Sequence, residues 1–251
     1  PDTLRYYLSI NMPENHDTDF NWPDFVERVN AELIAAYGNF VHRVLTLGNR
    51  LPESMPLHSF EDLTYCTEEI NKLESLHAQI TSSLERHRFK EALRFSMNAA
   101  QLGNQMLQNA TPWTYLNDLT QDGSKESMAK LSFGWRLCRY LAITMQPFLP
   151  FSSGKLWEML GENGKCETQN WYSAIDWDCA AKWNNHDPKP LFNRLDLNEI
   201  LEQEQGLAEI SDESNADPSH NVKGANRKKE GKKMPEGTTH LDFETFTKVE
   251  L

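Results

Sequence analysis

Apolar residues recur along the first part of the chain at the spacing of a helix. From residue 22 to residue 47 they lie three or four positions apart, which places them on one face of a long helix. This face consists of Val29, Leu33, Tyr37, Phe40, Val41 and Val44. Asn21 comes directly before the run and is a suitable N-cap, so we expect the helix to begin at residue 22.

Four more helices are expected from the same kind of pattern. The second starts near Ser59, whose hydroxyl can cap it together with Asp62, and runs to about residue 84. The third spans residues 89–108, the fourth residues 128–145, and a short fifth runs from Pro150 to about residue 160. Because short polar connections join these helices, the sequence predicts a mainly α fold, an antiparallel helix bundle.

The pattern changes after Gly161. Residues 171–183 are rich in Trp and Tyr without helical spacing, and we interpret residues 162–200 as an irregular strap that packs on the bundle. Residues 201–239 hold an acidic run and then a Lys-rich run, with few large apolar residues. Such a segment cannot offset the entropy lost on ordering, so we expect a flexible, disordered charged linker there. Apolar residues return in residues 240–251.

Composition and charge limit the function. A formal net charge of −12 argues against phosphate binding over the whole surface but is compatible with a local basic groove. Cys66, Cys138, Cys166 and Cys179 form no CxxC pair, so we expect reduced cysteines in a cytoplasmic protein and no metal site. The most apolar stretch, residues 131–151, is broken by two arginines and is read as a buried helix, with no membrane contact. The sequence has no Gly-rich phosphate loop and no HExxH or GxSxG motif, so we expect no catalytic residue in this chain.

A candidate binding surface lies opposite the apolar face of the first helix. At about 100° per residue, the residues on that side are Glu32, Asn39, Arg43, Thr46 and Arg50. Asn39 and Arg43 are one turn apart, so their side chains project together, although an ordinary solvated face has the same pattern. Trp113 is either a core residue or a flat platform for an unstacked base, and the pattern leaves both readings open.

Several segments, in order along the chain, resemble methionyl-tRNA synthetases. Residues 1–8 and 13–33 resemble the segment that follows the KMSKS loop of that family, and residues 140–151 resemble the helix and turn that close its bundle. Two motifs resemble its anticodon-binding domain, namely Tyr37-Gly-Asn-Phe-Val-His-Arg43 and Pro112-Trp113. The resemblance implies a bundle of the class I synthetase anticodon-binding type at residues 22–161, preceded at residues 1–21 by a connector from the catalytic domain.

The resemblance also implies a partner and site residues. Asn39, Arg43 and Trp113, with Pro112, would contact the CAU anticodon in the stem-loop of tRNA(Met). Trp113 would stack on the cytosine while Asn39 and Arg43 form hydrogen bonds to base edges. Candidate auxiliary contacts to the tRNA backbone are Arg50, Lys228, Lys229, Lys232 and Lys233. Residues 240–251 resemble the first strand of a truncated tRNA-binding OB domain.

The family's HIGH and KMSKS signatures and its zinc knuckle are absent from this sequence. ATP and Mg are therefore expected to serve the full-length methionine–tRNA ligase, and no cofactor is expected in this chain. The chain would be inactive alone, either as a fragment or as a free-standing tRNA-binding partner of a separate catalytic domain. Related synthetases for leucine, isoleucine, valine and cysteine use helical domains of the same plan, but the set of Asn39, Arg43 and Trp113 points to methionine.

An alternative of a different class is a helical scaffold that binds other proteins. Such a scaffold would explain the acidic balance and the aromatic strap without RNA. It predicts an acidic bundle surface, whereas a tRNA-binding domain predicts a local positive patch around Arg43, Arg50 and Trp113.

Overall fold

The computed structural model describes residues 1–14, 17–51, 62–179 and 188–214, with side chains up to residue 206. The chain divides into two compact units. The first holds Pro1–Thr18 and Arg28–Arg194, and the second holds Asp19–Glu27 and the chain from Leu195 onward. Within the described residues the regular structure is entirely helical, which confirms the mainly α fold.

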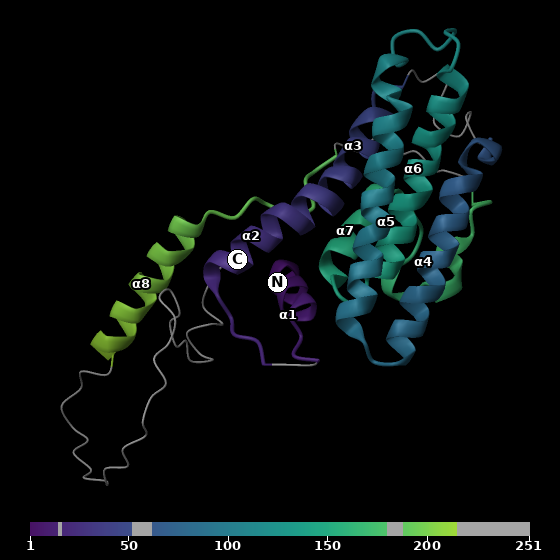
Figure 1. Ribbon diagram of the computed structural model, residues 1–251. Helices are drawn as coiled ribbons and strands as arrows, with labels where there is room; N and C mark the ends of the chain where they lie inside the picture. Colours follow the sequence, from purple (N-terminus) through teal and green to yellow (C-terminus); the bar gives the residue numbers. More distant parts are fainter. Residues whose placement is uncertain (15–16, 52–61, 180–187, 215–251) are drawn as a thin grey trace, which may run out of the picture. The chain divides into compact units, whose positions relative to one another are not determined.

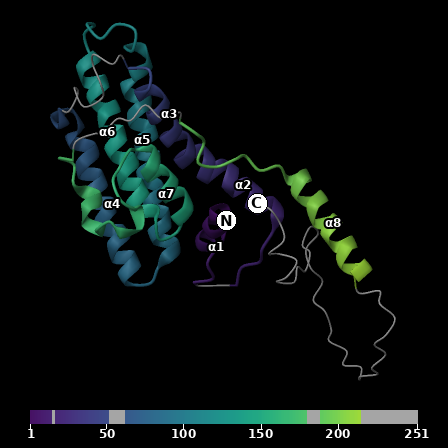
Figure 2. The same ribbon diagram turned by 180° about the vertical axis from the view of Figure 1, so that it is seen from behind.

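The first unit is a bundle built around three long helices. They are α4 (Thr67–Glu85), α5 (Phe89–Ala110) and α6 (Ser124–Met145), which lie side by side in Figures 1 and 2. Around them pack α1 (Asp2–Ile10), the π-helix η1 (Val29–Gly38), α3 (Asn39–Gly48) and α7 (Pro150–Met159). Helix α6 contacts α3, α5 and α7, so nearly all of its residues are buried and it forms the centre of the core.

The first long helix was predicted correctly in extent but not in type. Helical structure is unbroken from α2 (Trp22–Arg28) through η1 to the end of α3. Within η1 the hydrogen bonds reach five residues back, as in the bond from the Asn39 amide to the Ile34 carbonyl. A π-helix turns less per residue than an α-helix. A helical wheel drawn at 100° per residue therefore misplaces some side chains on this element.

The second helix of the bundle also differs from the prediction at its start. Asp62 caps a short 3-10 turn, η3 (Leu63–Cys66), by accepting a hydrogen bond from the Thr64 amide over 3.1 Å. Helix α4 begins only after this turn, at Thr67. Ser59, the expected start, lies outside the described residues.

Residues 1–21 contain a helix that the sequence reading treated as a connector. In α1, Tyr6, Tyr7 and Ile10 are buried. The Asp2 carboxylate accepts a hydrogen bond from the Ser152 amide at 2.6 Å, and Arg5 Nε donates to the Phe148 carbonyl at 2.9 Å. Helix α1 is thus fixed to the start of α7.

The strap crosses α4 and α6 and uses their polar side chains as anchors. Its short 3-10 turns are η5 (Cys166–Thr168) and η6 (Trp171–Ile175). Arg136 Nε donates to the Trp177 carbonyl at 2.8 Å, and Arg139 donates to the Ser173 carbonyl at 2.6 Å. The two arginines that break the apolar stretch of α6 therefore satisfy the backbone of the strap.

In the second unit, the expected cap of α2 is confirmed. Asn21 Oδ1 accepts a hydrogen bond from the Asp24 amide at 3.2 Å. The aromatic rings of Phe20 and Trp22 pack edge to face at 4.8 Å.

The linker prediction is wrong at its beginning, because helix α8 (Leu197–Ser214) covers residues 201–214. Asp196 caps α8 by accepting from the Asn198 amide at 2.8 Å, and its Leu, Glu and Gln residues favour helices. The rest of the predicted linker, residues 215–239, and the predicted strand at residues 240–251 lie outside the described residues.

Across the described part of the chain, no helix combines the length and apolar character needed to cross a membrane.

Candidate RNA-binding site

A sharp turn at the end of α5 places Trp113. Thr111 has φ 45° and ψ 50°, a left-handed conformation that is costly for a residue with a side chain. Pro112 follows, and since proline has no N–H to donate, α5 ends and the 3-10 turn η4 (Pro112–Thr114) begins. Pro112 is buried and Trp113 is half-buried, so the indole is neither a core residue nor a free surface group.

The predicted site residues Arg43 and Trp113 meet in the folded chain. The guanidinium carbon of Arg43 lies over the Trp113 ring, 5.2 Å from its centroid, which is the geometry of a cation–π interaction. Arg43 is half-buried, whereas Asn39, at the start of α3, is exposed. The structure therefore brings together two of the predicted residues, with Asn39 one helical turn away.

Two glycines allow the close helix packing that sets this geometry. A Cβ added at Gly103 of α5 would lie 2.5 Å from Phe40 Cε2, and one added at Gly134 of α6 would lie 3.1 Å from Val44 Cγ2. Next to Gly103, Asn104 Nδ2 donates to the Ala36 carbonyl at 2.8 Å. These contacts hold α3 against α5 and α6, and with it the Arg43 side chain against Trp113.

The other polar residues predicted on this helix have different surroundings. Thr46 is half-buried, as Arg43 is, and its Oγ1 atom is buried. That it shares the surface of Asn39 and Arg43 stays a prediction. Arg50 is exposed just beyond the end of α3. The predicted auxiliary contacts Lys228, Lys229, Lys232 and Lys233 lie outside the described residues.

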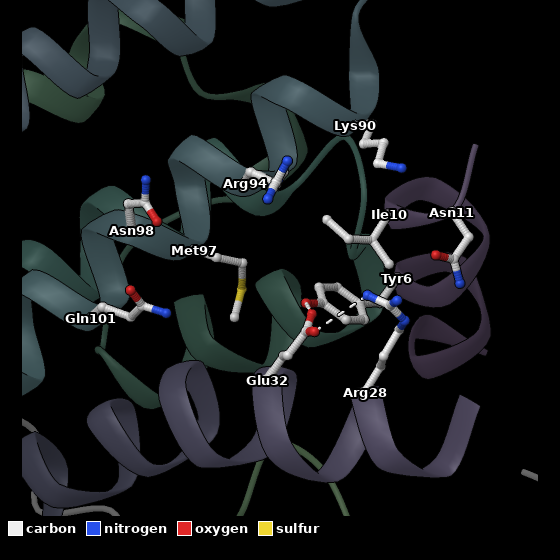
Figure 3. A pocket seen from close by; sticks show the side chains of 10 residues that line it. All are labelled: Tyr6, Ile10, Asn11, Arg28, Glu32, Lys90, Arg94, Met97, Asn98 and Gln101. Carbon is white, nitrogen blue, oxygen red and sulfur yellow. Dashed lines mark hydrogen bonds and ion pairs between the residues drawn. The ribbon is translucent and has the colours of Figure 1, made fainter. Parts of the chain in front are cut away.

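A polar cavity of about 450 Å³ lies further down the bundle, between α1, α5 and the helix that carries Arg28 and Glu32 (Figure 3). Glu32 accepts a hydrogen bond from the Tyr6 hydroxyl at 2.6 Å and pairs with Arg28 at 3.4 Å. Burial, and then the Glu32 carboxylate, raise the pKa of the Tyr6 hydroxyl. The Tyr6 hydroxyl therefore stays protonated at neutral pH and donates to Glu32, which is engaged within the protein.

Helix α5 supplies the opposite wall of this cavity. Lys90, Arg94, Asn98 and Gln101 point toward it in Figure 3. The sequence reasoning missed this wall, although a signal was visible: no Asp or Glu occurs between Glu91 and Asp118. In the described residues no three His, Cys, Asp or Glu side chains gather in a way that could hold a metal ion.

Known proteins match the chain over nearly its whole length. A family described as "tRNA synthetases class I (M)" matches residues 1–45, and one described as "Anticodon-binding domain of tRNA ligase" matches residues 68–215. Methionine–tRNA ligase of Methanopyrus kandleri is 33% identical over 214 residues, which are 85% of this chain. That of Bacteroides fragilis is 30% identical over 250 residues, which are 100% of this chain. The chain belongs to the methionyl-tRNA synthetase family.

The match is to the C-terminal, anticodon-binding part of the synthetases, which confirms the resemblance seen in the sequence. The chain spans 30% of the length of the M. kandleri relative and 34% of that of the B. fragilis relative. The ligase of Cytophaga hutchinsonii is 40% identical over 176 residues, 70% of this chain and 24% of the relative.

Solved synthetase structures share the fold. The apo form of Mycobacterium tuberculosis methionyl-tRNA synthetase superposes with a TM-score of 0.61 at 18% identity, over 78% of this chain and 39% of that one. The same enzyme in complex with methionyl-adenylate gives a TM-score of 0.60 at 19% identity, over 77% of this chain and 37% of that one. The helix bundle is thus the fold of the corresponding part of a methionyl-tRNA synthetase.

Proposed function

We propose that this chain binds the anticodon stem-loop of tRNA(Met) and reads its CAU anticodon with Asn39, Arg43 and Trp113. The reading would support ATP-dependent methionylation by a catalytic domain, linked to this chain or separate from it, and ATP and Mg would act in that domain. The observation that carries the proposal is the Arg43 guanidinium over the half-buried Trp113 ring. An aromatic ring held by an arginine is a preformed surface for an unstacked base.

Each of the three side chains has a chemistry that suits this role. A cytosine would stack on the face of Trp113 opposite Arg43, a contact that contributes about 1–3 kcal/mol per base. Asn39 is exposed and carries both a donor and an acceptor. Cytosine and uracil exchange donor for acceptor on their pairing edges, so an amide can distinguish them. Arg43 adds a planar fork of donors for a base or phosphate oxygen.

The first test of these roles is the affinity of Trp113 variants for a CAU stem-loop. Loss of stacking in Trp113→Ala should raise the Kd about 5- to 150-fold, the equivalent of about 1–3 kcal/mol. Trp113→Phe keeps an aromatic face and should lose much less. Phe151→Ala, which removes an aromatic side chain that is 60% exposed on α7, serves as the control. Normal affinity in Trp113→Ala would contradict the proposal.

The second test addresses hydrogen-bond readout. Arg43→Lys keeps the charge but removes the planar fork. We expect it to reduce the preference for CAU over a stem-loop in which the first anticodon base is U. An unchanged preference in both Arg43→Lys and Asn39→Ala would remove these residues from the reading of the anticodon.

The alternative of a protein-binding scaffold was based on the acidic balance and on the aromatic strap. Trp171 Nε1 donates to Thr81 Oγ1 at 2.8 Å, and Trp177 is buried and stacks on Tyr140 at 5.8 Å. These two indoles bind to or pack on the bundle, which supports the RNA-binding proposal over a scaffold that uses the strap. Of the strap aromatics in the described residues, Tyr172 is the one with high exposure, at 63%.

A further inference from the structure

One polar stripe runs along the outward side of α5. Its members recur every three or four residues and are Lys90, Arg94, Asn98, Gln101, Gln105 and Gln108. At 100° per residue they fall within a sector of about 80°. Lys90 is half-buried and the other five are exposed, so the stripe is a continuous line of side chains open to solvent.

The stripe carries positive charge and amides but no carboxylate. From Ala92 to Asn117 the sequence has no Asp or Glu, although the whole chain has a net charge of −12. A solvated helix face ordinarily mixes both signs in pairs one turn apart, as Lys72 and Glu68 do on α4. Among the described residues, the ion pairs include neither Lys90 nor Arg94. These two cations are therefore not neutralised by a carboxylate within the described residues.

The N-terminal half of the stripe forms one wall of the cavity in Figure 3. On the facing helix Arg28 pairs with Glu32 at 3.4 Å, and Glu32 also accepts a hydrogen bond from Tyr6, so this pair adds no net charge to the cavity. A second hollow, of about 700 Å³, shares Lys90 and Arg94 and continues to Arg88 and His87.

The acidic side chains of the second hollow are also engaged. Glu14 accepts a hydrogen bond from the Lys90 amide at 3.0 Å. Glu91 accepts one from Ser83 at 3.0 Å and pairs with Arg88 at 3.8 Å. The Glu14 carboxylate keeps its negative charge, but among the ion pairs of the described residues no carboxylate pairs with Lys90 or Arg94, so these two cations can still meet an anionic ligand.

The C-terminal end of the stripe leads to the proposed anticodon site. Gln108 lies in the last turn of α5, directly before the turn that places Trp113. From Lys90 to Gln108 the helix rises about 27 Å, at 1.5 Å per residue. Within this length, Gly103 lies against Phe40 of α3 and Asn104 donates to the Ala36 carbonyl of η1, so the first long helix packs on α5 at these residues.

We propose that the α5 stripe and the cavity at its end bind the sugar–phosphate backbone of the tRNA anticodon stem, without reading its sequence. Lys and Arg bind phosphate oxygens, and amide side chains bind phosphate and ribose hydroxyl groups, while carboxylates would repel the backbone. A line of such groups about 27 Å long that ends one turn before Pro112 and Trp113 fits an RNA stem that continues from a loop held at Trp113. This inference rests on the proposed function, since it takes the loop to be bound there.

The test is a salt series with the full 251-residue chain and its Lys90→Ala/Arg94→Ala variant. Both are titrated with the anticodon stem-loop carrying CAU and with the same stem-loop carrying UAU. Each lost phosphate contact should reduce the slope of log K against log salt by about 0.7–0.9. The double variant lacks two such contacts. When salt rises from about 50 to about 200 mM, the fold-increase in Kd should therefore be about 7 to 12 times smaller for the double variant than for the parent chain. The ratio of the two Kd values, CAU against UAU, should stay the same.

The matched control is Lys72→Ala/Lys155→Ala, which removes the same charge from exposed positions on α4 and α7. It should change the slope little. A third RNA, the anticodon loop without its stem, should bind the parent chain and the Lys90→Ala/Arg94→Ala variant equally, because the far end of the stripe would have no ligand.

The outcomes separate the two proposals. If the parent chain prefers CAU but the Lys90→Ala/Arg94→Ala variant matches the control in slope and affinity, the stripe does not bind the stem and the proposed function still stands. A variant that loses the preference for CAU would show base readout by the stripe and overturn the inference in this form. If the parent chain has no preference for CAU, the proposed function itself fails.

Discussion

The position of Asn39 and Arg43 depends on Gly103, which makes this glycine the best place to perturb the site from within the core. Carbon atoms in contact prefer about 3.5–4.0 Å. A Cβ at residue 103 would lie 2.5 Å from Phe40 Cε2, 2.6 Å from Phe40 Cζ and 2.7 Å from Leu137 Cδ2. Both neighbours are fully buried, so the ring or the whole of α3 must move by about 1 Å to accept the methyl group.

We expect the strain in Gly103→Ala to cost about 1–3 kcal/mol, the usual range for an overpacked core. Alanine also favours a helix over glycine, and that gain must be removed by a control. Gly154→Ala on α7 provides it, because a Cβ there has no atom within 4 Å and should stabilise by about 0.4–1 kcal/mol. The free energies of unfolding in urea of the two variants should differ by at least about 1 kcal/mol. Their melting temperatures should differ by about 2–12 °C.

A double-mutant cycle identifies the contact responsible. Phe40→Leu removes ring atoms that the added methyl group would strike, so it should cost less in the Gly103→Ala background than in the parent chain. The displaced α3 should also weaken binding of the CAU stem-loop, whereas Gly154→Ala should not. Equal stability of Gly103→Ala and Gly154→Ala would refute the idea that close packing at Gly103 positions α3.

Two further predictions concern the strap and the core beneath it. Arg139 pairs with Glu162 at 3.2 Å with both side chains nearly buried, so Arg139→Gln should lower the free energy of unfolding by about 3–5 kcal/mol, measured in urea. His77 is buried and stacks on Trp171 at 5.1 Å, and burial lowers its pKa from the ordinary 6.5. Below about pH 6.5 the unfolded chain therefore binds a proton at His77, whereas the folded chain binds it only at a lower pH. The free energy of unfolding should fall as the pH falls below about 6.5. His77→Gln should remove this part of the pH dependence of unfolding, and an unchanged profile would contradict the assignment.

The long helices of the bundle were predictable, because their apolar residues recur every three or four positions. Helices α3, α5 and α6 each bury one face or all faces, so their apolar residues recur at helical distances. The π-helix was not predictable, since Val29, Leu33 and Tyr37 are four apart and suit either kind of helix. Its different hydrogen bonding changes the angle between Glu32 and the residues of α3, which a wheel at 100° per residue does not take into account.

Other elements gave weaker signals. Helix α1 has nine residues and no side-chain cap, and its position depends on bonds from Asp2 and Arg5 to residues near the start of α7, far along the chain. Helix α8 is rich in Glu and Gln, and the same composition is typical of a disordered linker.

The site was predictable only in part. The spacing of Asn39 and Arg43 placed them one turn apart on one helix, but it could not show that Trp113 lies beneath the Arg43 guanidinium. That contact depends on glycines in two other helices, Gly103 and Gly134, which look like ordinary weak helix formers in the sequence. It was the resemblance to methionyl-tRNA synthetases that grouped Trp113 with Asn39 and Arg43. The roles of these three residues in reading the anticodon stay a prediction.

The most direct test of the account is the preference of the parent chain between two RNAs at one salt concentration. The first is the anticodon stem-loop carrying CAU, and the second differs only in having U in place of the first anticodon base. The account predicts tighter binding of the CAU stem-loop by the parent chain, with the preference lost in Trp113→Ala. Equal and weak binding of both RNAs by the parent chain would contradict it and would favour a helical module that binds something other than the anticodon.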